Sequence, residues 1–313
     1  MRHNLSSQMN FLTIIDSIVI LFILMGVGYA SYKSGIITRD GAHGLSSFLV
    51  NITLPSLIIV SMQIPLSSET FGRTMEMFAI AIIYYILSFA FAFTVPKYLT
   101  ESDLEKGVYS FMLVFSNLGF MGIPVTAAIF GNGAVFYTSL VMLPFGILAF
   151  SVGILMLRPD MGRYFDPKLF LNSGIIASIT GLIFFFTGFH IPAPFIDVLE
   201  ILGSLTTPLA MVVTGSLLAT MPASSMFKDF RIYAMTLFRL VIIPAVLYLI
   251  LNPFVSDRLL LGIIVILAGM PVAANAVLLA EEYNVDSTAA SKGVFISTLL
   301  CIFTIPLTAY FLL

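Results

Sequence analysis

The sequence predicts an all-α membrane protein in which ten transmembrane helices form two inverted five-helix repeats, with broken helices 4 and 9 crossing each other. Three observations support this fold class. Of the 313 residues, 59% are hydrophobic and only 10% are charged, whereas soluble domains average about 25% charged residues. Apolar runs long enough to cross a bilayer recur along the whole chain. Prolines recur at corresponding places in the two halves of the chain.

Each predicted span is a run of about 20 mostly apolar residues, the length that crosses the hydrocarbon core of a bilayer. The first run follows one basic residue and has no clear small-residue cleavage site, so we expect a retained helix rather than a signal peptide. The predicted spans are residues 11–32, 42–63, 74–96, 107–130, 133–157, 171–189, 194–219, 232–252, 259–280 and 290–312. The connections between them are short and indicate no soluble domain.

Lysine and arginine are distributed unevenly between the two sides of the predicted bundle. The basic residues in and beside the links after odd-numbered spans are Lys33, Arg39, Lys97, Lys106, Arg158, Arg163, Lys168, Lys228, Arg231 and Lys292. The opposite side holds Arg2, Arg73 and Arg258. Because cytoplasmic loops carry the excess of basic residues, this distribution predicts cytoplasmic odd-numbered links and two extracytoplasmic termini. We expect a multi-pass protein of the cell (inner) membrane.

Prolines mark a predicted internal repeat. Those inside spans 2, 4 and 5 are Pro55, Pro124 and Pro144, and those inside spans 7, 9 and 10 are Pro208, Pro271 and Pro306. A division into five plus five spans pairs these prolines, although Pro244 in span 8 has no clear counterpart. Because five is an odd number, the second half enters the membrane from the other side, as in many secondary transporters. The predicted units are residues 1–157 and 171–313, joined by a cytoplasmic linker of residues 158–170.

The stretch SNLGFMGIPV, residues 116–125, places poor helix formers in the middle of a predicted span. A proline in a helix interior costs about 3 kcal/mol, and a glycine costs about 1 kcal/mol relative to alanine. The residues of this kind near the midpoints of spans 4 and 9 are Asn117, Gly119, Gly122, Pro124, Pro271 and Asn275. One such cluster is commonly only a kink. Two clusters in corresponding spans predict that both helices break, with the broken backbone buried in protein or lining a cavity.

The two predicted breaks favour an anion-binding site. We expect each second half-helix to begin at or near its proline, a residue suited to the first helical position. Two half-helix N-termini would then face one place with free N–H groups and positive dipole ends, and the amides of Asn117 and Asn275 would add donors to a carboxylate. Residues 107–130 and 259–280 contain no Asp, Glu, Lys, Arg or His. A cation or proton site would need a charged or titrating group, so an anion is the expected ligand.

Asp16 and Arg239 are charged residues inside predicted spans, and each has two interpretations. Asp16 is either a solvated residue near the membrane interface or a proton-coupling group. Arg239 either snorkels or forms a structural ion pair, or it attracts the substrate. In MGVGYAS, residues 25–31, the glycines are interpreted as sites of close helix packing rather than as a channel filter.

Enzyme, metal and cofactor functions have no support in the sequence. H-E-x-x-H and phosphate-loop motifs are absent, so no catalytic residues, metal site or cofactor are predicted. His3, His43 and His190 lie near predicted span ends, and the single cysteine, Cys301, excludes an intramolecular disulfide. The net charge of −2 gives no electrostatic support for binding nucleic acid.

Four stretches together resemble the auxin efflux carrier family, whose prokaryotic members include permeases for malate and other organic acids. They are NITLPSL (51–57), SNLGFMGIPV (116–125), MPVAANAVLLAEEY (270–283) and STLLCIFTIPL (297–307). The resemblance covers essentially the whole chain. It implies a ten-helix inverted repeat in which two broken helices cross within a mobile transport domain. A scaffold domain alongside often forms a dimer interface in this family, so a homodimer is one expected assembly.

The resemblance also implies where the substrate binds. It maps the carboxylate site to Asn117 and to residues 271–275, and it places Asn51 and Pro55 along the route. The long cytoplasmic loop between the halves of the plant members is reduced here to about residues 158–170.

The predicted function is secondary transport of a small organic anion, such as a carboxylate, by alternating access. An inside-negative potential favours outward movement of one negative charge by about 2.3 kcal/mol per 100 mV, so export needs no ion site. Two alternatives stay open at this point: proton-coupled organic-acid uptake with Asp16 as the titrating group, and a membrane receptor that binds the anion without moving it. The expected partners are the organic anion and the lipid bilayer.

Overall fold

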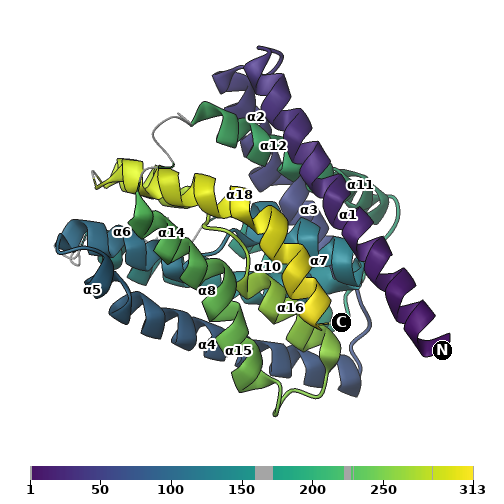
Figure 1. Ribbon diagram of the computed structural model, residues 1–313. Helices are drawn as coiled ribbons and strands as arrows, with labels where there is room; N and C mark the ends of the chain where they lie inside the picture. The colour runs from purple at the N-terminus through teal and green to yellow at the C-terminus, as the bar shows by residue number, and fades with distance from the viewer. Residues whose placement is uncertain (1, 159–171, 222–226, 228, 284, 313) are drawn as a thin grey trace.

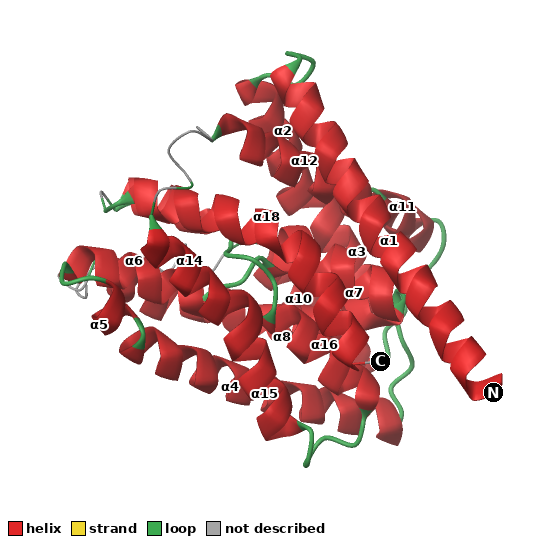
Figure 2. Cartoon of the chain, viewed as in Figure 1, coloured by secondary structure: helices red, strands yellow, loops and turns green. Residues whose placement is uncertain are grey.

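The computed structural model describes residues 2–158, 172–221, 227, 229–283 and 285–312, and every regular element in these ranges is a helix (Figure 2). Seven of the described helices are long and apolar enough to cross a membrane. They are Ile15–Lys33, Arg39–Ser61, Ser68–Leu99, Gly133–Leu157, Phe195–Thr220, Phe230–Leu251 and Ser287–Phe311. The prediction of an all-helical membrane protein is therefore confirmed.

Several long helices contain more than one regular element. The seven candidate spans are built from α1 (Arg2–Lys33), α2 (Arg39–Phe48), η1 (Leu49–Thr53), α3 (Leu54–Ser61), α4 (Ser68–Thr94), α5 (Pro96–Leu99), α8 (Gly133–Leu148), η3 (Ala149–Gly153), α9 (Ile154–Leu157), α11 (Phe195–Ser204), α12 (Thr206–Thr220), α14 (Phe230–Leu237), η6 (Phe238–Ile242), α15 (Ile243–Leu251) and α18 (Ser287–Leu312). The shorter helices are α6 (Asp103–Val114), η2 (Leu118–Gly122), α7 (Ile123–Phe130), α10 (Ser173–Thr187), α16 (Arg258–Ala268) and α17 (Asn275–Glu282).

The shorter helices fall where the sequence predicts broken spans, with α10 as the exception. Predicted span 4 is divided into α6 and the pair η2–α7, and predicted span 9 is divided into α16 and α17. Neither span contains one uninterrupted long helix, because three residues separate Val114 from Leu118 and six separate Ala268 from Asn275. Most other helix ends lie within a few residues of their predicted positions.

The helices form two groups. In the first, α1 lies along α12, and α3 packs against both α10 and α11. In the second, α4 packs against α6 and α8, α15 packs against α16, and α14 packs against α18. Figure 1 shows α1, α2 and α12 together at the upper right, with α4, α6, α14 and α15 toward the lower left. The first halves of the broken spans lie in the middle of the second group, because every residue of α6 from Gly107 and of α16 from Leu260 is buried.

Side-chain caps fix where these two buried helices begin. The Ser102 side chain accepts the amide of Glu105 at the start of α6. At the start of α16, the Asp257 side chain accepts the amides of Leu259 and Leu260. Such caps satisfy amides that have no partner inside the helix. Asp257 also pairs with Arg73 at 2.8 Å, which ties α16 to α4.

Three π-helical turns come just before prolines. The turns η1, η2 and η6 are each followed by an α-helix whose second residue is proline, namely Pro55, Pro124 and Pro244. Proline has no N–H, and its ring clashes with the carbonyl four residues earlier in a regular α-helix. A π turn is wider by one residue, so it relieves that clash and changes the direction of the side chains beside it. The π turns therefore accommodate these three prolines, and the break in span 4 is a separate feature.

Glycine allows α1 and α12 to touch through their backbones. A Cβ at Gly28 would overlap the Val212 carbonyl, and a Cβ at Gly215 would overlap the Met25 carbonyl. Ser216 Oγ donates to the Gly28 carbonyl across the same contact at 3.1 Å. Gly28 thus confirms the packing interpretation of MGVGYAS, whereas Gly26 faces open space.

Candidate functional site

The breaks in spans 4 and 9 lie against each other and pair through their backbones. Asn117 N donates to the Pro271 carbonyl at 2.8 Å, and Ala273 N donates to the Phe115 carbonyl at 3.0 Å. These two bonds make an antiparallel bridge between Ser116 and Val272. Unpaired backbone groups are costly in a buried apolar setting. Each break therefore supplies hydrogen-bond partners that the other break lacks.

Asparagine starts the second half of span 4. Asn117 is 4% exposed, and its Oδ1 accepts the amide of Phe120 at 3.2 Å while its carbonyl accepts the amide of Gly122 at 2.9 Å. The helical path resumes directly after it, at Leu118. Because Oδ1 makes this cap, the Nδ2 donors of Asn117 take no part in it.

The expectation that each second half begins at its proline is correct only in part. Pro124 is the second residue of α7, as expected, although η2 precedes it. In span 9 the expectation is wrong: Pro271 lies inside the break, and α17 begins at Asn275. The reason is that the Pro271 carbonyl accepts the Asn117 amide, which holds Pro271 in the non-helical backbone of the break.

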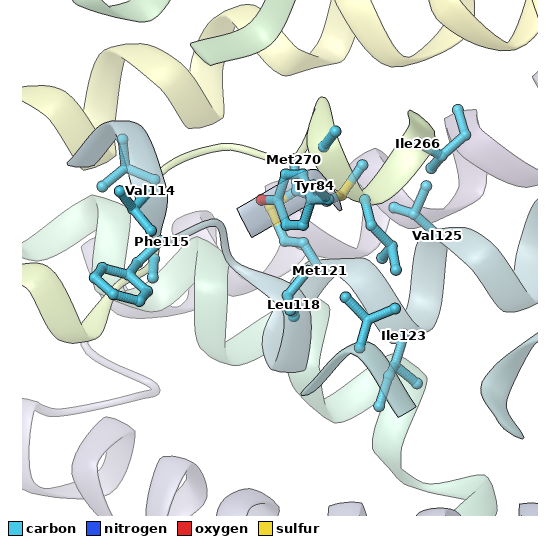
Figure 3. Close-up of a cluster of buried hydrophobic side chains, with 14 of the residues drawn as sticks. Tyr84, Val114, Phe115, Leu118, Met121, Ile123, Val125, Ile266 and Met270 are labelled. Atoms are coloured by element: carbon cyan, nitrogen blue, oxygen red, sulfur yellow. The ribbon is translucent and has the colours of Figure 1, made fainter. Parts of the chain in front are cut away.

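Small residues and apolar side chains close the space around the two breaks. A Cβ at Gly122 would come within 2.9 Å of Leu267 at the end of α16. A Cβ at Gly119 would lie 3.6 Å from Leu54 and 3.7 Å from Met142. Gly119 therefore adjoins both span 2 and α8. The labelled side chains around the breaks in Figure 3 are Tyr84, Val114, Phe115, Leu118, Met121, Ile123, Val125, Ile266 and Met270, and all are buried.

Arg239 binds the break of span 9 and the last turn of α6, just before the break of span 4. Its side chain is fully buried, with 0% exposure. Nε donates to the Met270 carbonyl at 3.1 Å, Nη1 to the Leu113 carbonyl at 2.7 Å and Nη2 to the Tyr84 hydroxyl at 3.0 Å. The side chain therefore does not snorkel toward the membrane surface, and the ion pairs among the described residues do not include it.

Three site residues were missed by the sequence predictions. The Tyr84 hydroxyl is 3.1 Å from Ser116 Oγ, which links Arg239 to the break in span 4. Ser297 Oγ, from α18, accepts the Val272 amide at 3.0 Å in the break of span 9. Serine and tyrosine are common in membrane helices, where a serine can bond to its own helix. Only their position beside a break distinguishes these three residues.

The remaining predicted residues lie at different distances from the breaks. Pro55 is half-buried next to Leu54, the span 2 residue that adjoins Gly119. The Oδ1 of Asn51 accepts the Ser173 hydroxyl at 2.6 Å at the start of α10. Asp16 is exposed on α1. Span 9 contributes Asn275, whose Oδ1 is buried with no hydrogen-bond partner among the described residues.

A charged cluster ties the start of α6 to the start of α14. Arg231 Nη1 lies 2.9 Å from Glu105 Oε2, and Arg231 Nη2 lies 3.1 Å from Asp229 Oδ2. The hydrogen bond from Arg231 is the main reason that the pKa of the Asp229 carboxyl lies below its usual value. Asp229 therefore stays ionised at neutral pH. The cluster joins α6, which leads into the break of span 4, to α14, which leads into η6 and Arg239.

A surface groove of about 260 Å³ lies between the α14–η6 segment and α18, and its lining includes none of the predicted site residues. Its lining is apolar apart from three hydroxyl groups. The lining residues are Tyr233, Thr236, Leu237, Leu240, Val241, Leu300, Phe303 and Thr304. The lining contains no positively charged side chain, so we do not place the anion there.

Comparison with known proteins identifies the family. The sequence profile of a family described as membrane transport protein matches residues 13–165 and 159–309, which together span nearly the whole chain. The chain belongs to this membrane transport family. The family is auxin efflux carrier-like, so the resemblance stated for the sequence is confirmed. The function is thereby established at the level of membrane transport.

Relatives of this membrane transport protein match along almost their whole lengths. An uncharacterized transporter of Methanocaldococcus jannaschii is 26% identical over 95% of this chain and 98% of its own. An uncharacterized transporter of Escherichia coli is 21% identical over 95% and 96% of the two chains. A Rhizobium meliloti protein provisionally named a malonate transporter is 22% identical over 91% of each chain.

Proposed function

We propose that this membrane transport protein is a secondary carrier that moves a small organic anion by alternating access. The observation that carries the proposal is the direct pairing of two broken helices deep in the apolar core. Interrupted helices of this kind form the substrate sites of many secondary transporters. The second helix group, which contains both breaks, would move as a unit against the group formed by α1, α3, α10 and α12.

The packing pattern supports two inverted repeats. With ten spans divided five plus five, α1 on α12 corresponds to α10 on α3, since each pairs the first helix of one half with the second helix of the other. The contact of α4 with α6 likewise corresponds to that of α15 with α16. We infer the predicted units 1–157 and 171–313 from this correspondence. The linker 158–170 lies almost wholly outside the described residues.

The surroundings of the breaks favour an anion as the substrate. The charged side chain that touches them is the cation Arg239. The second half-helices α7 and α17 begin beside the breaks, so their positive dipole ends lie on that side. We propose that Asn117 and Asn275 contact the carboxylate, and that Gly119, Gly122, Pro124 and Pro271 shape the backbone around it.

The substrate class proposed is a small carboxylic acid, with dicarboxylates such as malonate as the first probes. The name of the Rhizobium meliloti relative supports this choice. We further propose that the protein resides in the cell membrane with both termini outside the cytoplasm, because basic residues collect in the odd-numbered links. Figure 1 places the two termini toward the same side of the molecule, as an even number of spans requires.

The first prediction tests this function in proteoliposomes that contain the full chain and are loaded with radiolabelled malonate. A potassium diffusion potential that is positive outside is expected to speed malonate exit, because each 100 mV supplies about 2.3 kcal/mol per charge. Asn275→Ala is expected to lower the malonate flux at least about tenfold, since hydrogen bonds to charged groups contribute about 1.5–3 kcal/mol.

Asn132→Ala is the matched control, because Asn132 is an exposed asparagine at the start of α8 whose side chain makes no cap. It should transport like the wild type. The same assay with a panel of monocarboxylates, dicarboxylates and indole acids covers the other members of the substrate class. If no acid of this panel responds to the potential, the carrier proposal fails.

A further inference from the structure

The guanidinium of Arg239 is a fully buried charge whose three hydrogen-bond partners are all neutral. Two are backbone carbonyls, of Leu113 and Met270, and the third is the Tyr84 hydroxyl. A buried charge normally needs an opposite charge or strong hydrogen bonds to offset the loss of water. For Arg239, the loss of water must be offset by the two carbonyls and the hydroxyl that accept its hydrogen bonds.

Both carbonyls lie at helix C-termini. Leu113 is in the last turn of α6, and Met270 is two residues beyond the end of α16. The last carbonyls of a helix lack partners inside the helix and carry the negative end of its dipole. Arg239 therefore lies where two negative helix ends meet, which explains how a charge without a carboxylate partner is tolerated there.

Local structure fixes the guanidinium in this place. Arg239 belongs to η6, the π turn that precedes Pro244, and such turns redirect side chains. Nε, Nη1 and Nη2 each bond to a different partner, so the planar group has one orientation. The Tyr84 hydroxyl is in turn 3.1 Å from Ser116 Oγ. The position of the guanidinium is therefore set by the π turn η6, and its orientation is set by the three hydrogen bonds.

In transporters with broken helices, unwound carbonyls and half-helix C-termini commonly bind the coupling cation. We propose that Arg239 is a built-in cation that takes the place of such an ion. It holds the ends of α6 and α16 together, so that anion transport requires no free sodium ion. The proposal deepens the proposed carrier function and rests on it for its transport readout. Arg239 acts here as a positioning residue, because it orients the breaks rather than touching the substrate.

The second prediction tests this role with Arg239→Ala, which removes the charge and leaves a space that fits a free guanidinium ion. The purified full chain in detergent is expected to lose several degrees in Tm. Millimolar guanidinium should restore most of that loss, and urea, which has nearly the same shape but no charge, should not. In proteoliposomes, the malonate flux of the variant should likewise return with guanidinium. The wild-type flux should not change when choline replaces sodium.

Equal rescue by urea and guanidinium would show that Arg239 only fills space, and it would overturn the proposal. An Arg239→Ala protein with wild-type Tm and flux would do the same. If this variant fails to fold, Arg239→Lys carries the test: it keeps the positive charge and is expected to transport malonate without sodium, and a sodium requirement would contradict the proposal. Tm rescue by guanidinium in a chain that moves no organic acid would refute the carrier function and leave the role of Arg239 standing.

Discussion

At the scale of single residues, some polar groups in the apolar core, such as Asn117, Ser297 and Arg239, bond to backbone atoms at or beside the breaks. Asn117 and Asn275 could be predicted because an asparagine near the middle of an apolar span is unusual. Ser297 could not, since its partner Val272 becomes a neighbour only when α18 packs beside the break. The sequence left Arg239 with two interpretations, and its contacts with Leu113 and Met270 now show a structural interaction with backbone carbonyls rather than an ion pair.

The third prediction concerns Ser297→Ala. This change leaves the buried Val272 amide without its acceptor, and an unsatisfied buried amide costs about 1–3 kcal/mol. The free energy of unfolding in detergent is expected to fall by about that amount. Ser139→Ala is the matched control, because Ser139 is equally buried but donates to the Val135 carbonyl of its own helix. If both variants lost the same free energy of unfolding, the hydrogen bond between Ser297 and the Val272 amide would contribute nothing beyond an ordinary bond within a helix.

At the scale of elements, glycine and proline have different effects in different helices. Gly28 and Gly215 let two long helices touch, whereas Gly119 and Gly122 leave room around a break. Pro124 follows a π turn, and Pro271 lies in the non-helical segment between α16 and α17. The sequence shows where the glycines and prolines are. Their effects depend on which helix packs against each of them, and the residues next to them in the chain do not determine that.

The fourth prediction compares Gly28→Ala with Gly26→Ala on the same helix. The new methyl group at Gly28 would overlap the Val212 carbonyl, so α1 and α12 must separate, and overpacking of this kind costs about 1–3 kcal/mol. Gly26 is exposed and has open space around it, so alanine there is expected to be neutral or stabilising by up to about 1 kcal/mol. Unfolding measured by thermal melting in detergent checks both; a Gly28→Ala protein as stable as the wild type would argue against the backbone contact.

At the scale of the whole molecule, one of the contacts between the two helix groups lies where span 2 adjoins the break of span 4. Leu54 belongs to the group of α1, α3, α10 and α12, and Gly119 belongs to the group that contains both breaks. If the second group moves against the first during transport, this contact must change in every cycle. A cross-link at this point is therefore a direct test of the movement.

The fifth prediction uses the pair Leu54→Cys and Gly119→Cys in a Cys301→Ser background, since Cys301 is the single native cysteine. Oxidative cross-linking is expected to abolish malonate flux, and reduction should restore it. The control pair, Gln63→Cys and Ile191→Cys, lies within the first group, where Gln63 Oε1 accepts the Ile191 amide at 2.8 Å. Its cross-link should leave the flux intact. Full transport by the cross-linked Leu54–Gly119 pair would exclude relative movement at this contact.

The sequence by itself determined the helical membrane class, the approximate ends of the spans and the two places where helices break. These features follow from local chemistry: apolar length sets a span, and Asn117 or Pro271 interrupts one. Only the tertiary structure decided which carbonyls and amides pair across the breaks and that Arg239 joins α6 to α16. Hydrogen-bond partners far apart in the chain depend on packing, because a buried backbone group must take the donor or acceptor that the fold brings to it.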